Sequence, residues 1–253
     1  MDTPPGVPPP APTGGRYVTV EIPRVRPVLT YILLGLTITV FLLQLVSEYT
    51  QGYDLPALLG MKVNSLILEG ELWRLITPML LHGSLPHIIF NMYALYALGP
   101  SLESSYGHSR FLALYLIAGF AGNVLSFLFS PNPSLGSSTA IFGLIGAEGI
   151  FLYRNRELFG SQARRALTNV VIIAGANLLF GSMSAGIDNW GHIGGLLGGT
   201  FFAWFAGPLY QLAGDFNFPR LVDLHVGGRA LGAAVLDLLV FSALAAMRFF
   251  RGF

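Results

Sequence analysis

The sequence predicts an all-α membrane protein, a polytopic bundle of helices that cross a lipid bilayer. Of its 253 residues, 53% are hydrophobic and only 11% carry a charge. An ordinary soluble domain carries about 25% charged residues, which it needs to cover its surface in water. Several apolar windows are also long enough to span a bilayer. We therefore expect lipid to surround most of this chain.

The composition excludes several classes of protein. The formal net charge of +1 gives no argument for a nucleic-acid partner. The absence of cysteine excludes a disulfide framework, thiol catalysis and thiolate metal sites. Residues 1–15 are rich in proline and glycine and contain no hydrophobic run, so they are expected to form a disordered tail.

Seven windows have the length and apolar character of transmembrane helices, for which a bilayer core about 30 Å thick needs ~20 residues. They cover residues 27–46, 85–102, 111–129, 138–153, 166–183, 190–209 and 230–247. The first window is longer than the apolar part of a signal peptide and has no small-residue cleavage site after it, so it is expected to remain as an anchor. The connection over residues 47–84 is half apolar and too long for a turn, which predicts a structured segment in the interface.

Lys and Arg residues divide unevenly between the two sides of this topology. One side holds ten of them, Arg16, Arg24, Arg26, Arg110, Arg154, Arg156, Arg164, Arg165, Arg220 and Arg229. The other side holds four, Lys62, Arg74, Arg248 and Arg251. The positive-inside rule therefore predicts a cytoplasmic N-terminus and an external 47–84 connection.

Polar residues gather at the predicted outer ends of three windows. His82 precedes the second window, in which His87 and Asn91 are four residues apart and share one helix face. Ser138 opens the fourth window, and His192 lies near the start of the sixth. Polar side chains at membrane depth are costly and persist mainly where they meet one another or a water-filled cavity. Their common depth predicts a shared pocket.

The chemistry available in that pocket is narrow. Without cysteine or an acidic pair, the reactive groups are serine hydroxyls, imidazoles and a carboxamide. A serine needs a base to become a nucleophile, and His192 can serve Ser138 if their helices pack together, which the glycines in both windows favour. Backbone N–H groups at the start of the 138–153 helix, with His87 and Asn91, can then donate to an oxyanion.

In their order and spacing, these motifs resemble those of the rhomboid family of intramembrane serine proteases, over about residues 27–209. Trp73 and Arg74 resemble the Trp-Arg pair of the family's first loop, and residues 82–91 resemble its His-x4-His-x3-Asn run. The segment Gly-Ser-Ser-Thr-Ala-Ile-Phe-Gly at 136–143 resembles its Gly-x-Ser-Gly segment. Residues 192–199 resemble its His-x-x-Gly-x-x-x-Gly motif.

The resemblance implies a six-helix catalytic core in which Ser138 is the nucleophile, His192 the base, and Asn91 and His87 lie on the oxyanion side. It implies transmembrane protein substrates whose helices unwind into the site, and a reaction that needs no metal or organic cofactor. The seventh window is then a C-terminal addition. Thr139 stands where the family commonly has glycine after the nucleophile, and Gly191 stands where alanine commonly precedes the histidine.

The expected organisation is a tail over residues 1–15, a protease core over 16–210, and a linker with a C-terminal transmembrane helix over 211–253. Some residues also allow a purely structural interpretation. His82, His87 and Asn91 could form hydrogen bonds that hold their segment, Ser137 could cap a helix, and Trp73 with Arg74 could anchor and brace the first loop.

The sequence leaves the roles of three acidic residues undecided. Glu148 lies ten residues after Ser138, ~15 Å deeper along the helix, so it cannot reach His192. Glu148 and Asp237 would be acids at membrane depth with unknown partners, either structural or functional. Asp188 lies one turn before His192 and could orient it, or could be a solvated acid in a loop.

Two functions fit these features. One is a serine endopeptidase that cleaves peptide bonds in or near transmembrane segments of membrane proteins. The other is an inactive rhomboid-like protein that binds client transmembrane helices, and the presence of both Ser138 and His192 favours the enzyme. A transporter would require an inverted repeat and broken helices, which are not evident. Nothing resembles an organellar transit peptide, so a prokaryotic cell membrane is the simplest location.

Overall fold

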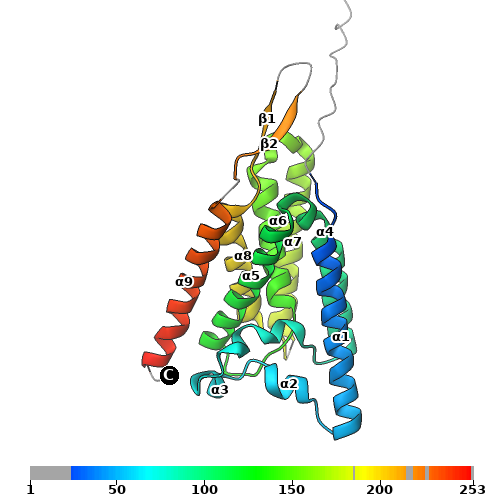
Figure 1. The fold of residues 1–253 in the computed structure, drawn as a ribbon, viewed down its shortest axis with the longest axis vertical. Helices are drawn as coiled ribbons and strands as arrows, with labels where there is room; N and C mark the ends of the chain where they lie inside the picture. Colours follow the sequence, from blue (N-terminus) through cyan, green and yellow to red (C-terminus); the bar gives the residue numbers. More distant parts are fainter. Residues whose placement is uncertain (1–23, 185, 215–218, 226–227, 252–253) are drawn as a thin grey trace, which may run out of the picture.

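The computed structural model describes residues 24–184, 186–214, 219–225 and 228–251, and the tail predicted at 1–15 lies outside them. Its seven long helices are arranged as an elongated bundle, with α1 and α9 on opposite sides (Figure 1). They are α1 (Val28–Gln51), α4 (Leu85–Tyr106), α5 (His108–Phe129), α6 (Ser138–Arg154), α7 (Arg156–Met183), α8 (Asn189–Ala206) and α9 (Arg229–Arg251). Each predicted window falls largely within one of these helices, which confirms the all-α membrane bundle.

Four of these helices, α1, α5, α7 and α9, are long and apolar enough to cross a membrane by length and composition alone. These helices differ in how much of their surface is buried inside the bundle. The most apolar stretch of α5 is 78% buried, whereas that of α7 is 6% buried. Helix α5 is therefore the centre of the bundle, whereas α7 presents most of its surface to lipid.

Glycines allow α5, α6 and α8 to approach one another closely. A Cβ atom added at Gly194 would lie 2.7 Å from the carbonyl oxygen of Ala121 on α5. A Cβ atom at Gly199 would overlap the backbone of Gly143 on α6. Neither position can carry a side chain without moving a helix, so the contact that joins α6 to α8 is made by backbone.

The connection over residues 47–84 is structured, as expected. It contains the helices α2 (Leu55–Gly60) and α3 (Asn64–Leu68) and the 3₁₀ turns η1 (Leu72–Leu75) and η2 (Thr77–Leu80). The buried guanidinium of Arg74 donates hydrogen bonds to the carbonyls of Met61 (2.8 Å) and Leu58 (2.9 Å). The indole of Trp73 donates to the carbonyl of Leu59 at 3.0 Å. These contacts agree with the interpretation of Trp73 and Arg74 as a loop brace.

Two parts of the chain differ from the sequence prediction. The segment expected to be a linker contains an antiparallel hairpin, β1 (Tyr210–Ala213) with β2 (Arg220–Asp223). It is held to the bundle by an ion pair of 2.7 Å between Arg110 and Asp223. Helix α7 begins at Arg156, ten residues before the predicted window, because the window marks only its apolar part. The backbone departs from helical geometry at Gly160, inside this polar extension.

We expect Gly199→Val to destabilise the bundle, because the new side chain would force α6 and α8 apart. Overpacking of this kind costs ~1–3 kcal/mol, which corresponds to a fall of roughly 5 °C in Tm for a chain of this size. Gly175→Val on the exposed face of α7 is the matched control, since a Cβ atom there meets nothing within 4 Å. Thermal unfolding in detergent micelles, followed by circular dichroism, measures both. Equal losses would contradict a special role for the α6–α8 contact.

Candidate active site

The structure brings Ser138 and His192 together at one end of the bundle. Ser138 is the first residue of α6, and His192 lies in the first turn of α8. Their Oγ and Nε2 atoms are 2.9 Å apart. The hydroxyl is half-buried and the imidazole is buried. This is the distance at which a histidine can take the proton of a serine.

The ring of His192 is held by an aromatic neighbour. The ring of Phe142 stacks on it with a centroid separation of 4.2 Å and an angle of 14° between the planes. The Nδ1 atom of His192 is buried and has no hydrogen-bond partner among the described residues. The orientation of this imidazole therefore comes from stacking and helix packing. The sequence analysis gave Phe142 no role, although its spacing of four residues from Ser138 places both on one face of a helix.

Asp188 matches neither of its two predicted interpretations. Its carboxylate accepts a hydrogen bond from the backbone N–H of Gly191 at 3.0 Å and another from the hydroxyl of Ser126. The first of these bonds caps the N-terminus of α8. Asp188 is thus a half-buried helix cap, which fixes where α8 begins but forms no hydrogen bond with the imidazole of His192.

Gly136 allows His87 to lie beside the start of α6. Its φ angle of +134° lies in a region that favours glycine. A Cβ atom there would also lie 2.7 Å from Nε2 of His87 and 3.7 Å from Oγ of Ser138. The imidazole of His87 therefore occupies the space next to the serine hydroxyl that any side chain at position 136 would fill.

His82 connects three parts of the site. Its Nε2 lies 3.3 Å from the hydroxyl of Ser137, and its ring meets that of His87 edge to face at 5.0 Å. The Gln44 side chain of α1 accepts from the backbone N–H of His82 at 3.0 Å and donates to its carbonyl at 3.1 Å. Burial, with a smaller effect of His87, lowers the pKa of His82 to about 3, so this ring is neutral. Ser137 stands at the N-cap of α6, but its hydroxyl faces His82 instead of capping the helix.

Asn91 is buried one turn after His87 on α4. Its amide donates to the backbone carbonyl of His87 at 3.1 Å and forms no hydrogen bond with Ser138 or His192. The structure thus places Asn91 on the same helix face as His87, as predicted, with its side chain engaged by its own helix.

Thr139 points away from the serine hydroxyl, into the helix packing. A Cβ atom added at Gly122 of α5 would lie 2.6 Å from Cβ of Thr139, and one at Gly191 would lie 3.0 Å from its Cγ2. Two glycines on neighbouring helices therefore make room for the side chain at position 139. The buried side chain of Thr139 therefore lies between α5 and α8.

Hydrogen-bond donors are available at the mouth of α6. The first intrahelical bond runs from the N–H of Ile141 to the carbonyl of Ser137 at 3.0 Å. The N–H groups that precede Ile141 have no acceptor within the helix, and the helix dipole adds partial positive charge at this end. The mouth of α6, where Ser138 lies, is therefore suited to hold a developing negative charge.

The two deep acids lie away from this site. Glu148 is half-buried on α6, three turns beyond Ser138. Asp237 is fully buried on α9, and neither carboxylate oxygen has a hydrogen-bond partner among the described residues. Neither of them contacts His192.

Comparison with known proteins identifies the family of this chain. A family model described as Rhomboid domain matches residues 69–209. Rhomboid protease GluP of Bacillus subtilis is 44% identical over 178 residues, which are 70% of this chain and 34% of GluP. RHOMBOID-like protein 9, chloroplastic, of Arabidopsis thaliana is 38% identical over 160 residues, 63% of this chain and 37% of that protein. The chain thus spans about a third of the length of each of these relatives.

The match includes the segments that carry Arg74, His87, Asn91, Ser138 and His192. It also includes helices α4 to α8, which form the site, and more than half of the whole chain. The chain therefore belongs to the rhomboid family of integral membrane proteins.

Proposed function

We propose that this chain is a serine-type intramembrane endopeptidase that cleaves peptide bonds in or near transmembrane segments of membrane proteins. The observation that supports this most directly is the distance of 2.9 Å between Oγ of Ser138 and Nε2 of His192. The name of GluP, a rhomboid protease, supports the same class of reaction. No metal or organic cofactor is needed for it.

In the proposed reaction, Oγ of Ser138 attacks the scissile carbonyl while Nε2 of His192 takes its proton. The carbonyl oxygen becomes an oxyanion and accepts hydrogen bonds from the N–H groups at the mouth of α6, with His87 and Asn91 as further donors. Collapse of the tetrahedral intermediate breaks the C–N bond, and His192 protonates the leaving amine. Water, activated by the same imidazole, then hydrolyses the acyl-enzyme and restores Ser138.

Among the described residues, no carboxylate forms a hydrogen bond with the imidazole of His192. The face of Phe142 lies against the imidazole at 4.2 Å, where an aromatic ring attracts a cation. We expect this contact to offset part of the cost of the imidazolium that forms during each transfer. The stacking also limits rotation of the ring, so Nε2 stays directed at Ser138.

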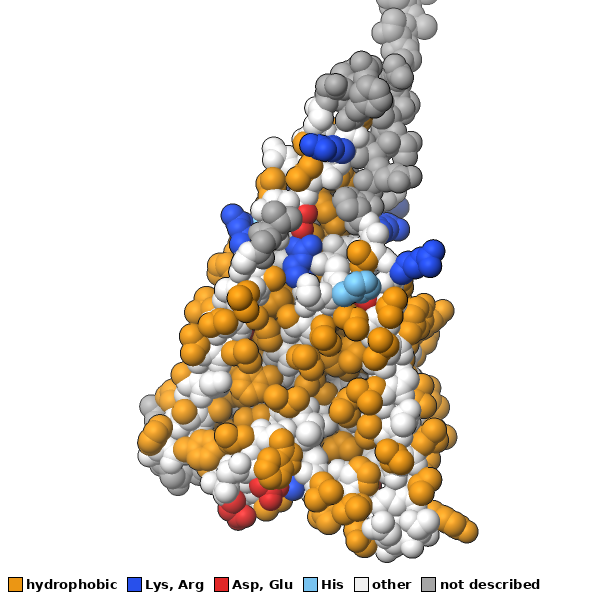
Figure 2. Space-filling model, in the orientation of Figure 1, with side chains coloured by type: hydrophobic (Ala, Val, Ile, Leu, Met, Phe, Trp, Pro, Cys, Tyr) orange, Lys and Arg blue, Asp and Glu red, His pale blue; other side chains and the backbone are white. Residues whose placement is uncertain are grey.

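The charge distribution supports the predicted orientation, with a cytoplasmic N-terminus. Helix α6 runs ~25 Å from Ser138 to Arg154, so the site and the arginine-rich end are on opposite sides of the bundle. Figure 2 shows blue Lys and Arg side chains gathered at the end that carries the hairpin. With this end in the cytoplasm, the serine would open to the outer side of a prokaryotic cell membrane. Residues 16–210 then form the protease core, and 211–253 the C-terminal addition.

The alternative is an inactive member that binds client helices. Such a protein would have no need for a serine and a histidine at hydrogen-bonding distance, since binding alone does not require a base. The two functions are separated by covalent reactivity at Ser138, which only the enzyme requires.

We expect a fluorophosphonate probe to label the parent protein but not Ser138→Ala or His192→Ala, because the probe reacts only with an activated serine. Cleavage of a transmembrane model substrate should fall at least ~10³-fold in both variants. Ser109→Ala, an exposed serine at the start of α5, is the matched control and should behave like the parent. Parental cleavage by a folded Ser138→Ala variant would end the peptidase proposal.

We expect His87→Ala and Asn91→Ala to lower kcat by ~10²–10³ each, with little change in KM, because oxyanion donors act mainly on the transition state. Asn177→Ala is a matched control, since its amide also bonds only to its own helix, at the carbonyl of Ile173 (2.8 Å). A loss of Tm with unchanged kcat would assign His87 and Asn91 to structure alone. Single-turnover cleavage in detergent, combined with thermal unfolding, distinguishes these outcomes.

A further inference from the structure

A cavity of about 400 Å³ lies where α6, α8 and α9 meet, at the arginine-rich end of the bundle. Its lining combines basic and apolar residues. The basic members are Arg154, Arg229 and His225, and the remaining members are Trp204, Phe205, Gly232, Ala233 and Leu236. None of them belongs to the proposed catalytic site, which lies at the other end of α6.

The guanidinium of Arg154 is held in place at this cavity. It donates to the backbone carbonyl of Trp204 and lies over the indole ring, 5.4 Å from its centroid. Its Nη2 also lies 3.4 Å from Nε2 of His225, whose Nδ1 lies 2.9 Å from the carbonyl of Gly207. The imidazole can therefore donate to Gly207 and accept from Arg154. These contacts leave part of the guanidinium fork free for a ligand.

Among the residues that the structure describes, no carboxylate lies within 4 Å of Arg154 or Arg229. The nearby acid Asp223 is already paired with Arg110 at 2.7 Å. Two unpaired guanidinium groups beside an apolar surface are suited to a phosphate group that carries a hydrophobic tail.

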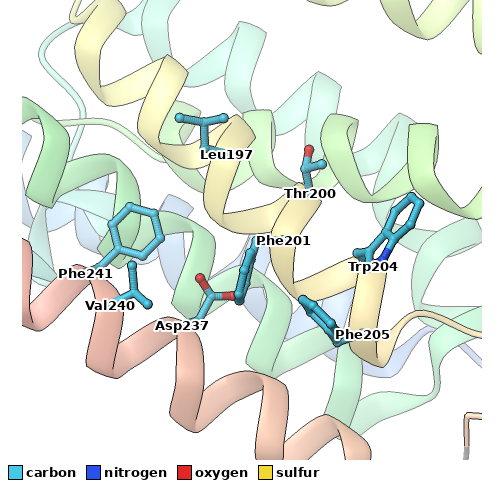
Figure 3. Close-up of a pocket in the computed structure, with 8 residues that line it drawn as sticks. All are labelled: Leu197, Thr200, Phe201, Trp204, Phe205, Asp237, Val240 and Phe241. Atoms are coloured by element: carbon cyan, nitrogen blue, oxygen red, sulfur yellow. The ribbon is translucent and has the colours of Figure 1, made fainter.

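An apolar groove continues from this cavity along α8 and α9 (Figure 3). It has a volume of about 440 Å³ and shares Trp204 and Phe205 with the basic cavity. Its other lining residues are Leu197, Thr200, Phe201, Asp237, Val240 and Phe241. Asp237 lines the groove, but its carboxylate oxygens are covered, so a ligand would meet hydrocarbon.

The length of the groove suits one chain of a lipid. Leu197 and Phe205 are ~12 Å apart along α8. From Arg229 to Phe241, α9 covers ~18 Å, which is close to the ~15 Å depth of one hydrocarbon leaflet.

We infer that this site binds one anionic phospholipid, with its phosphate at Arg154 and Arg229 and an acyl chain in the groove between α8 and α9. The head group and the chain would bridge the core to the C-terminal helix. The arginines would bind the phosphate and the groove would bind the acyl chain. A free phosphate would leave the groove empty, and a neutral lipid would leave the arginines without an anion.

The test uses the full chain in phosphatidylcholine nanodiscs or detergent, with phosphatidylglycerol as the probe and native mass spectrometry as the readout. Each arginine is expected to raise the affinity for phosphatidylglycerol about fivefold. Replacing both Arg154 and Arg229 by Gln should therefore lower this affinity at least tenfold. The matched control replaces Arg156 and Arg220 by Gln, which removes the same charge at the same end but outside the cavity. It should change affinity less than about twofold, because only screened surface charge is lost.

Gly232→Leu tests the apolar half of the site and remains informative if the arginine variant does not fold. A Cβ atom at Gly232 meets nothing within 4 Å, so the new side chain would fill the cavity without displacing the protein. Leucine also favours a helix more than glycine does. We expect the bound phosphatidylglycerol to fall at least about fivefold while Tm is unchanged or higher.

Three results would overturn the proposal. The first is equal retention of phosphatidylcholine and phosphatidylglycerol, which would remove the case for an anion site. The second is displacement of the lipid by inorganic phosphate, which would show a head-group site without a chain groove. The third is an equal loss of lipid in the Arg154/Arg229 variant and the Arg156/Arg220 control, which would show that only the overall positive charge of this end attracts the lipid. The readout is lipid binding, so it does not depend on whether the chain is a protease.

Discussion

The proximity of Ser138 and His192 depends on a contact between α6 and α8 in which the backbones of two glycines meet directly. Water does not drive helices together inside a bilayer, so close packing of small residues has to do so. Gly143 and Gly199 touch through their main chains, and Gly194 lies against α5. A side chain at Gly199 would overlap the backbone of Gly143 and push α6 away from α8. The proposed reaction therefore requires that these positions carry no side chain.

Two buried charged side chains, Glu103 and Lys62, are satisfied by partners far away in the sequence. Helix α1 begins without a side-chain cap of its own, and Glu103 of α4 accepts from the N–H groups of Leu29 and Thr30, each at 2.7 Å. Lys62 is buried and donates to the carbonyls of Ser130 (3.0 Å) and Asn132 (2.7 Å). The Lys62 bonds join the 47–84 connection to the loop between α5 and α6, beside the site, and the Glu103 bonds join α1 to α4 at the opposite end of the bundle.

The sequence analysis identified what periodicity and hydropathy encode. Apolar windows predict helices well, because lipid allows few alternatives for a spanning segment, and the polar residues that interrupt them marked Ser138 and His192. It could not predict contacts between side chains that are distant in the sequence. The capping by Asp188 and the stacking of Phe142 depend on how two helices meet, which no window records. The hairpin was missed because its strands, such as Tyr210–Ala213, are only four residues long.

The threonine at position 139 illustrates why a departure from a family pattern has to be judged in three dimensions. Taken alone, a larger residue after Ser138 suggests a crowded oxyanion site. In the structure its side chain lies against Gly122 and Gly191, so the added volume is accommodated between α5 and α8. Threonine at position 139 is thus compatible with the site because α5 and α8 carry glycine where they face this side chain. Such compensation is expected in a close-packed interior, where volume gained at one point must be lost nearby.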